Sequence, residues 1–360
     1  MQEEIIRSVL DGRDTLGLLP TGGGKSITFQ VPAIALDGVT IVVTPLISLM
    51  KDQVDNLRER GVKAVYLHAG LTRAEHRLAL DRCRYGRVKL LYVSPEKLQS
   101  PRFIDELRDV TVGLIVVDEA HCISQWGYDF RPSYLKINDL RKRVPGVPVL
   151  ALTASATPEV VDDIMARLGF RERNLYARSF SRDNLSYIVR NGDDKERQLL
   201  RVLNGTSGTA IVYVRSRRRT RETAEWLLRE GVSAEFYHAG LSPEEKEERQ
   251  NRWKSGETRV IVATNAFGMG IDKPDVRAVV HLDTPSSLEE YYQEAGRAGR
   301  DGLPAYAVLL ASSVDKGRLT RLISERFPDK EYCRRVYELA GNFAGVAVGA
   351  GFNQVYEFNF

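Results

Sequence analysis

The sequence predicts an α/β protein built from two doubly wound parallel-sheet domains in tandem, followed by a short C-terminal extension. First, short apolar runs alternate with longer mixed segments, which is typical of parallel strands covered by helices on both faces. Second, stretches of the second half repeat stretches of the first half at constant spacing. Third, at roughly 150 residues per domain, a chain of 360 residues has the length of about two domains.

The first domain is expected to span residues 1–178. Apolar residues at helical spacing predict a crossover helix over 45–57, and a further helix is expected over 27–36. Because residues 174–194 are polar and irregular, the domain boundary is placed there. The strands of this domain are predicted at 16–19, 39–43, 64–67, 90–93, 113–117 and 149–152.

A glycine-rich loop follows the first predicted strand and precedes the first predicted crossover helix. Its sequence from Leu19 to Ser26 is LPTGGGKS. Such a loop presents backbone N–H groups and a helix N-terminus to phosphate oxygens, so we expect it to bind a nucleotide. The strict pattern has a glycine where this chain has Leu19, and a plain glycine turn is the alternative. The nucleotide-binding candidates are Thr21, Gly22, Gly23, Gly24, Lys25 and Ser26.

The second domain, expected over residues 179–326, reads as a copy of the first. Residues 61–71 align with 231–241, and residues 89–94 align with 259–264, both at an offset of 170. We take strand 210–214 as the counterpart of the strand before the glycine loop, and it runs into an arginine-rich segment. Because only the first copy has a glycine-rich phosphate loop, we expect a single nucleotide to bind in the cleft between the two domains. Residues 327–360 are expected to hold a helix over 332–340 and the start of a truncated accessory region.

Composition sets broad limits on compartment and partners. The net charge of +4 is compatible with a polyanionic partner without requiring one. The N-terminus lacks a signal-peptide pattern, and no apolar run approaches the roughly 20 residues that span a bilayer. Cys83, Cys122 and Cys333 are widely separated, which predicts neither a disulfide framework nor a metal site. We therefore expect a reducing, cytoplasmic compartment.

Two carboxylates, Asp118 and Glu119, follow the apolar run 113–117. The carboxyl end of a buried parallel strand is where α/β folds bind ligands. There Asp118, together with Ser26, would hold Mg²⁺, and Glu119 would accept a proton from an attacking water. The alternative is a solvated acidic turn that caps a helix.

An aromatic-rich segment comes directly after the carboxylates. Trp126, Tyr128 and Phe130 precede Arg131, and aromatic faces with a guanidinium suit stacking on unpaired bases. We expect this segment to link single-strand binding to the chemistry at Glu119. The alternative is that these aromatic side chains fill a domain core.

A pair of arginines, Arg297 and Arg300, lies in the second domain. Their spacing of three predicts one face of a helical turn, so both are expected to reach the interdomain cleft. There an arginine stabilises negative charge on a transferring phosphoryl group. The alternative is a surface turn paired with Glu294 or Asp301.

Taken in order, these segments resemble the RecQ family of superfamily 2 DNA helicases over about residues 2–320. The resemblance implies two RecA-like domains, ATP and Mg²⁺ as cofactors, and 3′→5′ unwinding of DNA in repair or recombination. In this superfamily the first glycine of the phosphate loop is often absent, which accounts for Leu19. The matching segments are 20–26, 44–53, 94–98, 118–121, 121–132, 152–157, 263–274 and 293–300.

The resemblance also assigns residues. Gln2 would read the adenine, Gly270 and Asp272 would contact the nucleotide, and Gln293 would join Lys25, Asp118, Glu119, Arg297 and Arg300 in catalysis. Tyr128 stands where the family has histidine, and a lone Cys333 cannot build the family's four-cysteine zinc module, so no zinc site is expected. The implied DNA-binding or coupling residues are Thr44, Pro45, Ser94, His121, Gln125, Trp126, Phe130, Arg131, Thr157 and Thr264.

Three functions remain open at this level. The leading one is a DNA helicase acting on single-stranded and partly duplex DNA, as a monomer associated with the nucleoid. An RNA helicase or a DNA translocase that does not unwind shares the same nucleotide chemistry. A nucleic-acid-binding scaffold without turnover is the third, although it would not need the whole catalytic set.

Overall fold

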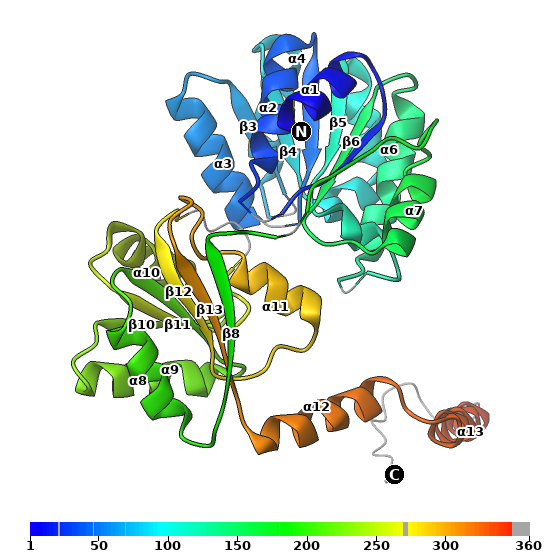
Figure 1. The fold of residues 1–360 in the computed structure, drawn as a ribbon. Coiled ribbons are helices and arrows are strands. Elements are labelled where there is room, and N and C mark those ends of the chain that lie inside the picture. Colours follow the sequence, from blue (N-terminus) through cyan, green and yellow to red (C-terminus); the bar gives the residue numbers. More distant parts are fainter. Residues whose placement is uncertain are drawn as a thin grey trace.

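Two fully parallel sheets, each flanked by helices, form the body of the molecule (Figure 1). This computed structural model describes residues 1–347, apart from 21, 46, 69, 128, 180 and 269–272. The first sheet has the strand order β3-β4-β2-β5-β6-β1-β7, and the second has the order β10-β11-β9-β12-β13-β8. The predicted α/β class with tandem doubly wound sheets is confirmed.

The first sheet and its helices occupy the N-terminal half. Its strands are β1 (Thr15–Leu18), β2 (Val39–Val43), β3 (Ala64–Leu67), β4 (Leu90–Val93), β5 (Val112–Val117), β6 (Val149–Thr153) and β7 (Leu175–Ala177). Its helices are α1 (Gln2–Leu10), α2 (Lys25–Ala35), α3 (Ile47–Glu59), α4 (Arg73–Tyr85), α5 (Pro101–Glu106), α6 (Ile137–Arg143) and α7 (Pro158–Arg167). Short 3₁₀ helices are η1 (Pro95–Gln99), η2 (Leu107–Asp109), η3 (Ala120–Ile123) and η4 (Pro132–Lys136).

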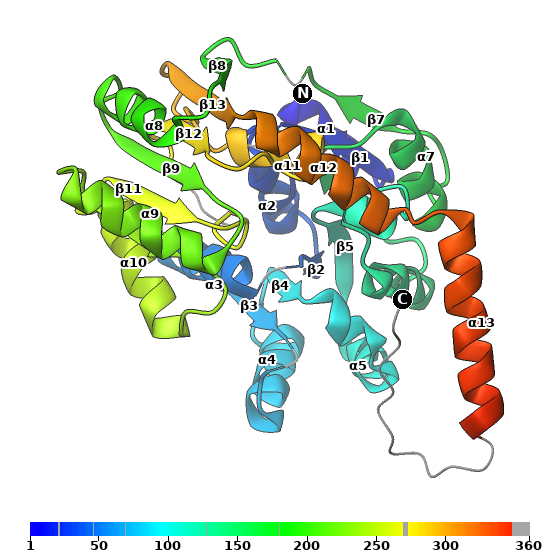
Figure 2. The same cartoon turned by 90° about the horizontal axis from the view of Figure 1, so that it is seen from below.

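The second sheet and the C-terminal helices follow. The strands are β8 (Leu185–Asn191), β9 (Thr209–Tyr213), β10 (Ala234–Tyr237), β11 (Val260–Ala263), β12 (Val276–His281) and β13 (Ala305–Ala311). The helices are α8 (Lys195–Asn204), α9 (Arg217–Arg229), α10 (Pro243–Ser255), α11 (Leu288–Ala295), α12 (Ser313–Arg326) and α13 (Lys330–Ala347). Helix α13 covers the helix expected over 332–340 and stands apart from both sheets (Figure 2).

The strands are apolar because both faces of each sheet are covered. Every residue of β2, β4 and β6 is buried, and the side chains of the first sheet divide between two apolar clusters, one on each face. The second sheet is covered in the same way by two further clusters. This explains why the strands read as continuous apolar runs rather than as alternating patterns. No helix in the described part of the chain is long and apolar enough to cross a membrane.

The internal repeat is more extensive than the two matched segments indicate. Each element from β1 to β4 has a counterpart that begins 170 residues later, so that β8 replaces β1, α8 replaces α2 and β9 replaces β2. Even the capping boxes match, with Thr72 and Glu75 at the start of α4 and Ser242 and Glu245 at the start of α10. The two halves therefore share one topology.

This register corrects one expectation. Strand 210–214 is not the counterpart of the strand before the glycine loop, because β9 occupies the place of β2. The true counterpart of the loop lies between β8 and α8, where Lys195 takes the position of Lys25. The Lys195 ammonium is partly buried, donates to the carbonyl oxygen of Leu282 and pairs with Asp315 at 2.6 Å. In the second copy this lysine therefore holds α12 against the sheet.

Asp14, just before β1, is a buried charge that joins three parts of the first domain. It accepts hydrogen bonds from the backbone N–H of Val149 at 3.0 Å and from the guanidinium of Arg141 at 2.6 Å. We expect Asp14→Ala to lower the free energy of unfolding by roughly 3 kcal/mol, because Arg141, whose side chain is largely covered, would lose its carboxylate partner. Urea denaturation measures this, and Asp139→Ala, which removes an exposed pair with Lys136, is the control with a change below about 1 kcal/mol.

The same carboxylate predicts a pH dependence. Burial alone would raise the pKa of Asp14, but the hydrogen bonds from Arg141 and from the backbone of Arg171 and Val149 outweigh it and hold the pKa below its ordinary value of 3.8. The stabilisation is therefore present above pH 3.8 and is lost as the pH falls through the lowered pKa. Equal destabilisation of Asp14→Ala at neutral pH and in strong acid would contradict this role.

Candidate active site in the interdomain cleft

The glycine loop adopts a conformation that side chains would obstruct. Gly22 and Gly24 have φ values of +79° and +73°, in the left-handed region that favours glycine. A Cβ atom on Gly23 would lie 2.8 Å from the carbonyl oxygen of Pro20. Gly24 is the N-cap of α2, which begins at Lys25. The N–H groups of the loop therefore lie next to the free N–H groups at the N-terminus of this helix. The predicted order of strand, loop and helix is thus present.

Gln2 lies directly against this loop. Its side-chain amide donates to the carbonyl oxygen of Gly23 at 2.9 Å, and a Cβ atom on Gly24 would lie 2.0 Å from the same nitrogen. The amide of the candidate adenine reader is therefore fixed at the edge of the phosphate loop.

The two carboxylates lie at the carboxyl end of β5. Asp118 accepts hydrogen bonds from the Thr44 hydroxyl at 3.2 Å and from the backbone N–H of Glu119 at 3.0 Å. The Lys25 ammonium lies 3.6 Å from the carboxylate of Glu119, which links the loop to this strand end. Glu119 has φ +48° and ψ +48°, a left-handed conformation that costs a non-glycine residue about 1–2 kcal/mol. Such strain typically marks a functional position.

The electrostatic environment separates the two carboxylates. Burial, reinforced by the charge of Glu119, raises the pKa of Asp118 to about 6. Burial also acts to raise the pKa of Glu119, but Lys25, His121 and Arg297 outweigh it and hold the pKa below its ordinary value. Glu119 is thus kept as a carboxylate, and its Oε2 atom is buried with no hydrogen bond from the described residues. A buried, unsatisfied carboxylate oxygen is suited to orient a water molecule.

The arginines reach this site from the second domain. Arg300 packs against the phosphate loop, since a Cβ atom on Gly22 would lie 3.1 Å from Arg300 Cγ. Arg297 is buried, donates to the carbonyl oxygen of Gly268, and its charge acts on Glu119. The expected helical face is wrong in detail, because α11 ends at Ala295 and both arginines lie in the turns that follow. Gln293 lies on α11 itself.

The surface alternative for these arginines would pair them with Glu294 or Asp301. In the structure Glu294 pairs with His281 at 2.8 Å, and Asp301 pairs with Arg277 at 2.6 Å. Both carboxylates therefore pair with other residues, which argues against the surface alternative.

The aromatic segment presents its tryptophan to solvent. The side chain of Trp126 is 79% exposed, which argues against the core alternative, whereas Phe130 and Arg131 are partly buried. Arg131 pairs with Asp129 at 2.9 Å and contacts the carbonyl oxygen of Pro45 at 3.5 Å. The segment thus connects the surface to the start of α3. Tyr128 lies outside the described residues, as do Thr21, Gly270 and Asp272.

The other predicted nucleic-acid residues fall into two groups. Gln125 and Thr157 are exposed, and Thr157 caps the N-terminus of α7. The side chains of the remaining ones are buried in this structure. These buried residues are Thr44, Pro45, Ser94, His121 and Thr264.

Further residues of the cleft carry no signal in the sequence. A cavity of about 250 Å³ lies between the aromatic segment and α11, with Trp126 and Val160 on one side and Leu288 and Tyr292 on the other. Leu288 is 81% exposed, which only the structure reveals. Two ion pairs also join α3 to α10 across the domains, Lys51 with Glu247 at 3.8 Å and Asp52 with Lys254 at 3.5 Å.

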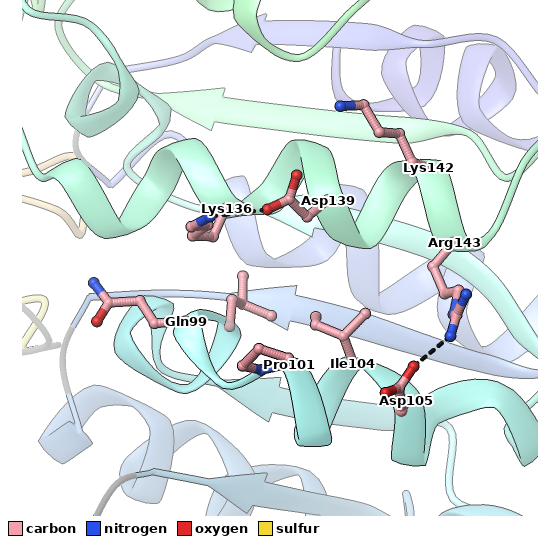
Figure 3. A pocket seen from close by; sticks show the side chains of 9 residues that line it. Gln99, Pro101, Ile104, Asp105, Lys136, Asp139, Lys142 and Arg143 are labelled. Atoms are coloured by element: carbon pink, nitrogen blue, oxygen red, sulfur yellow. Dashed lines mark hydrogen bonds and ion pairs between the residues drawn. The ribbon is translucent and has the colours of Figure 1, made fainter.

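A second cavity lies on the first domain, among η1, α5 and the η4–α6 segment (Figure 3). It measures about 320 Å³, and charged side chains line it in pairs, Asp105 with Arg143 and Asp139 with Lys136. None of the predicted site residues lines it.

Comparison with known proteins agrees with this geometry. Residues 1–164 match the DEAD/DEAH box helicase family, and residues 194–302 match the helicase conserved C-terminal domain. The ATP-dependent DNA helicase RecQ of Bacillus subtilis is 47% identical over 317 residues, which cover 87% of this chain and 54% of the relative. The ATP-dependent DNA helicase RecQ of Pasteurella multocida is 42% identical over 346 residues, which cover 95% and 55%.

Among solved structures, the helicase Lhr of Mycobacterium smegmatis, determined with single-stranded DNA and AMP-PNP, has the same fold. Its TM-score is 0.70 at 21% identity, over 86% of this chain and 45% of that one. The chain spans about half the length of the curated relatives it matches. Tandem RecA-like sheets, the ordered motifs and these identities together show that the chain belongs to the RecQ family.

Proposed function

We propose that this chain is the core of an ATP-dependent DNA helicase that moves 3′→5′ along single-stranded DNA and separates duplexes in repair or recombination. One observation carries the proposal: groups from both domains meet at one cleft, with Arg300 of the second domain packed on Gly22 of the phosphate loop. A site divided in this way assembles only when the domains approach each other. Turnover can then be coupled to their movement along a strand.

The roles of the residues follow from their positions. Lys25 and the loop N–H groups bind the phosphates, while Ser26 and Asp118 would hold Mg²⁺, which neutralises phosphate charge. The donor set fits, because Asp118 is a buried carboxylate at the carboxyl end of β5, beside the phosphate loop, and oxygen atoms are the ligands that Mg²⁺ prefers. Glu119 orients and deprotonates the attacking water, and Arg300 stabilises charge on the γ-phosphoryl group. Arg297 is the phosphate-sensing partner, next to Gln293.

Several further assignments belong to this proposal. We divide the chain into domains at 1–178 and 179–326, with residues 327–360 as a separate C-terminal segment. We also propose that the protein acts as a monomer on single-stranded and partly duplex DNA, in the cytoplasm at the nucleoid. The gap between β7, which ends at Ala177, and β8, which begins at Leu185, supports the boundary.

Measuring ATP hydrolysis without polynucleotide, with single-stranded DNA and with RNA tests the proposal. We expect strong stimulation by single-stranded DNA that declines steeply with salt, because phosphate contacts carry the binding. Equal stimulation by RNA would favour an RNA helicase, and no hydrolysis at all would favour a scaffold. Duplexes with 3′ or 5′ single-stranded tails then test unwinding and polarity. Stimulated hydrolysis without strand separation would identify a translocase.

Trp126→Ala is expected to uncouple hydrolysis from DNA. Loss of one stacking side chain should weaken single-strand binding roughly 10-fold and reduce DNA-stimulated hydrolysis, while basal hydrolysis and ATP binding persist. Tyr85→Ala is the control, because Tyr85 is an equally exposed aromatic residue at the end of α4, away from the cleft. Full DNA stimulation in Trp126→Ala would show that the aromatic segment does not carry the coupling.

A further inference from the structure

Three side chains with metal-binding atoms converge beneath the aromatic segment. His121, Cys122 and Asp129 each offer one ligand atom, and these atoms lie within 4.8 Å of one another. His121 and Cys122 belong to η3, which follows the carboxylate pair, and Asp129 returns to them from the loop. None of the roles assigned above uses Cys122 or Asp129.

The spacing of the ligand atoms fits a tetrahedral site. Cys122 Sγ lies 3.6 Å from His121 Nε2 and 3.7 Å from Asp129 Oδ2. In a tetrahedral zinc site, with Zn–S near 2.3 Å and Zn–N or Zn–O near 2.0 Å, two such ligand atoms are roughly 3.5 Å apart. Two of the three separations between ligand atoms are therefore close to those of a tetrahedral site, and the third is no longer than 4.8 Å.

Hydrogen bonds from neighbouring residues fix the orientation of the His121 and Asp129 side chains, as is typical of metal ligands. His121 Nδ1 bonds the Thr153 hydroxyl at 2.9 Å, which leaves Nε2 directed at the cluster. Arg131 donates two hydrogen bonds to Asp129 Oδ2, at 2.9 and 3.1 Å, and so fixes the carboxylate beside the cluster. Orienting partners of this kind are typical of histidine and carboxylate ligands.

We propose that His121, Cys122 and Asp129 bind a thiophilic divalent cation such as Zn²⁺ or Cd²⁺. Binding converts the Cys122 thiol to a thiolate and releases one proton to solvent. The thiolate adds one negative charge beside the Asp129 carboxylate, which is already paired with Arg131, and a water molecule fills the fourth position. Asp129, the most exposed of the three, places the entry path on the loop side.

The ion would also have a consequence that rests on the proposed function. It would tie the loop at Asp129 to His121, whose ring lies 3.5 Å from the carboxylate of Glu119. A tethered loop cannot follow the DNA, so micromolar Zn²⁺ is expected to reduce DNA-stimulated hydrolysis more than basal hydrolysis. A zinc-selective chelator should restore it.

The direct test measures binding without ATP or DNA, so it is independent of any activity. Titration of the nucleotide-free protein with Cd²⁺ should produce the charge-transfer absorbance of a cadmium–thiolate bond at one equivalent, with release of about one proton. Cys122→Ser should remove this absorbance and lower Zn²⁺ affinity about 100-fold or more. Cys333→Ser and Cys83→Ser are matched controls that keep it, since neither cysteine belongs to the cluster.

A second variant guards against misfolding of Cys122→Ser. Asp129→Asn alters a loop residue outside the core and should weaken Zn²⁺ binding at least 10-fold while the thermal unfolding midpoint stays near that of the parent protein. Absence of a thiolate band in the parent protein, or its persistence in Cys122→Ser, would overturn the proposal. Unchanged affinity in Asp129→Asn would remove the third ligand from it.

Discussion

Glu119→Gln is expected to reduce ATP turnover by about 100- to 10,000-fold while ATP still binds. The amide keeps the size of the side chain but cannot accept a proton from the attacking water. Lys25 and the phosphate loop are unchanged, so the affinity for ATP should stay within a few-fold of the parent value. Steady-state hydrolysis with saturating single-stranded DNA, together with binding of a fluorescent ATP analogue, measures the two effects separately.

The control for this substitution is Glu159→Gln. Glu159 is an exposed carboxylate in the first turn of α7, and its change should leave turnover intact. Because Glu119 is held in a left-handed conformation between buried groups, the unfolding midpoint of Glu119→Gln must also be measured. A folded variant with substantial residual hydrolysis would refute the role of Glu119 as general base.

Much of the fold follows from local pattern. The strands predicted at 39–43, 64–67 and 90–93 match β2, β3 and β4 residue for residue, because a fully buried parallel strand is a short apolar run with polar ends. The phosphate loop was equally predictable, since three adjacent glycines before Lys-Ser are typical of a phosphate-binding turn. It was harder to predict which strand of the second half corresponds to which strand of the first half. The counterpart of β1 is β8 (LSYIVRN), whose residues are largely exposed and mix apolar with polar side chains, so it lacks the continuous apolar run of a fully buried strand.

The site was predictable in composition but not in geometry. Sequence order brought Lys25, Glu119 and Arg300 into one hypothesis, yet the left-handed backbone of Glu119 depends on contacts around the end of β5. The sequence also does not show which side chains are buried. The Thr44 hydroxyl could face either solvent or Asp118, and its contact with Asp118 follows only from the neighbouring positions of β2 and β5 in the sheet. The cluster of Cys122 with Asp129 arises from the return of the loop, which no spacing rule predicts.

Arg300→Ala is the complementary prediction from the second domain. Removal of the guanidinium from the face of the phosphate loop is expected to lower the rate of hydrolysis by about 1,000-fold or more, since an arginine of this kind stabilises charge only in the transition state. ATP and DNA binding should change little, and Arg300→Lys should not rescue the rate, because an ammonium cannot reproduce the planar guanidinium. Arg326→Ala, at the exposed end of α12, is the control in the same half of the chain. Single-turnover hydrolysis measures the effect, and a rate near that of the parent protein would mean that the two domains do not share one active site.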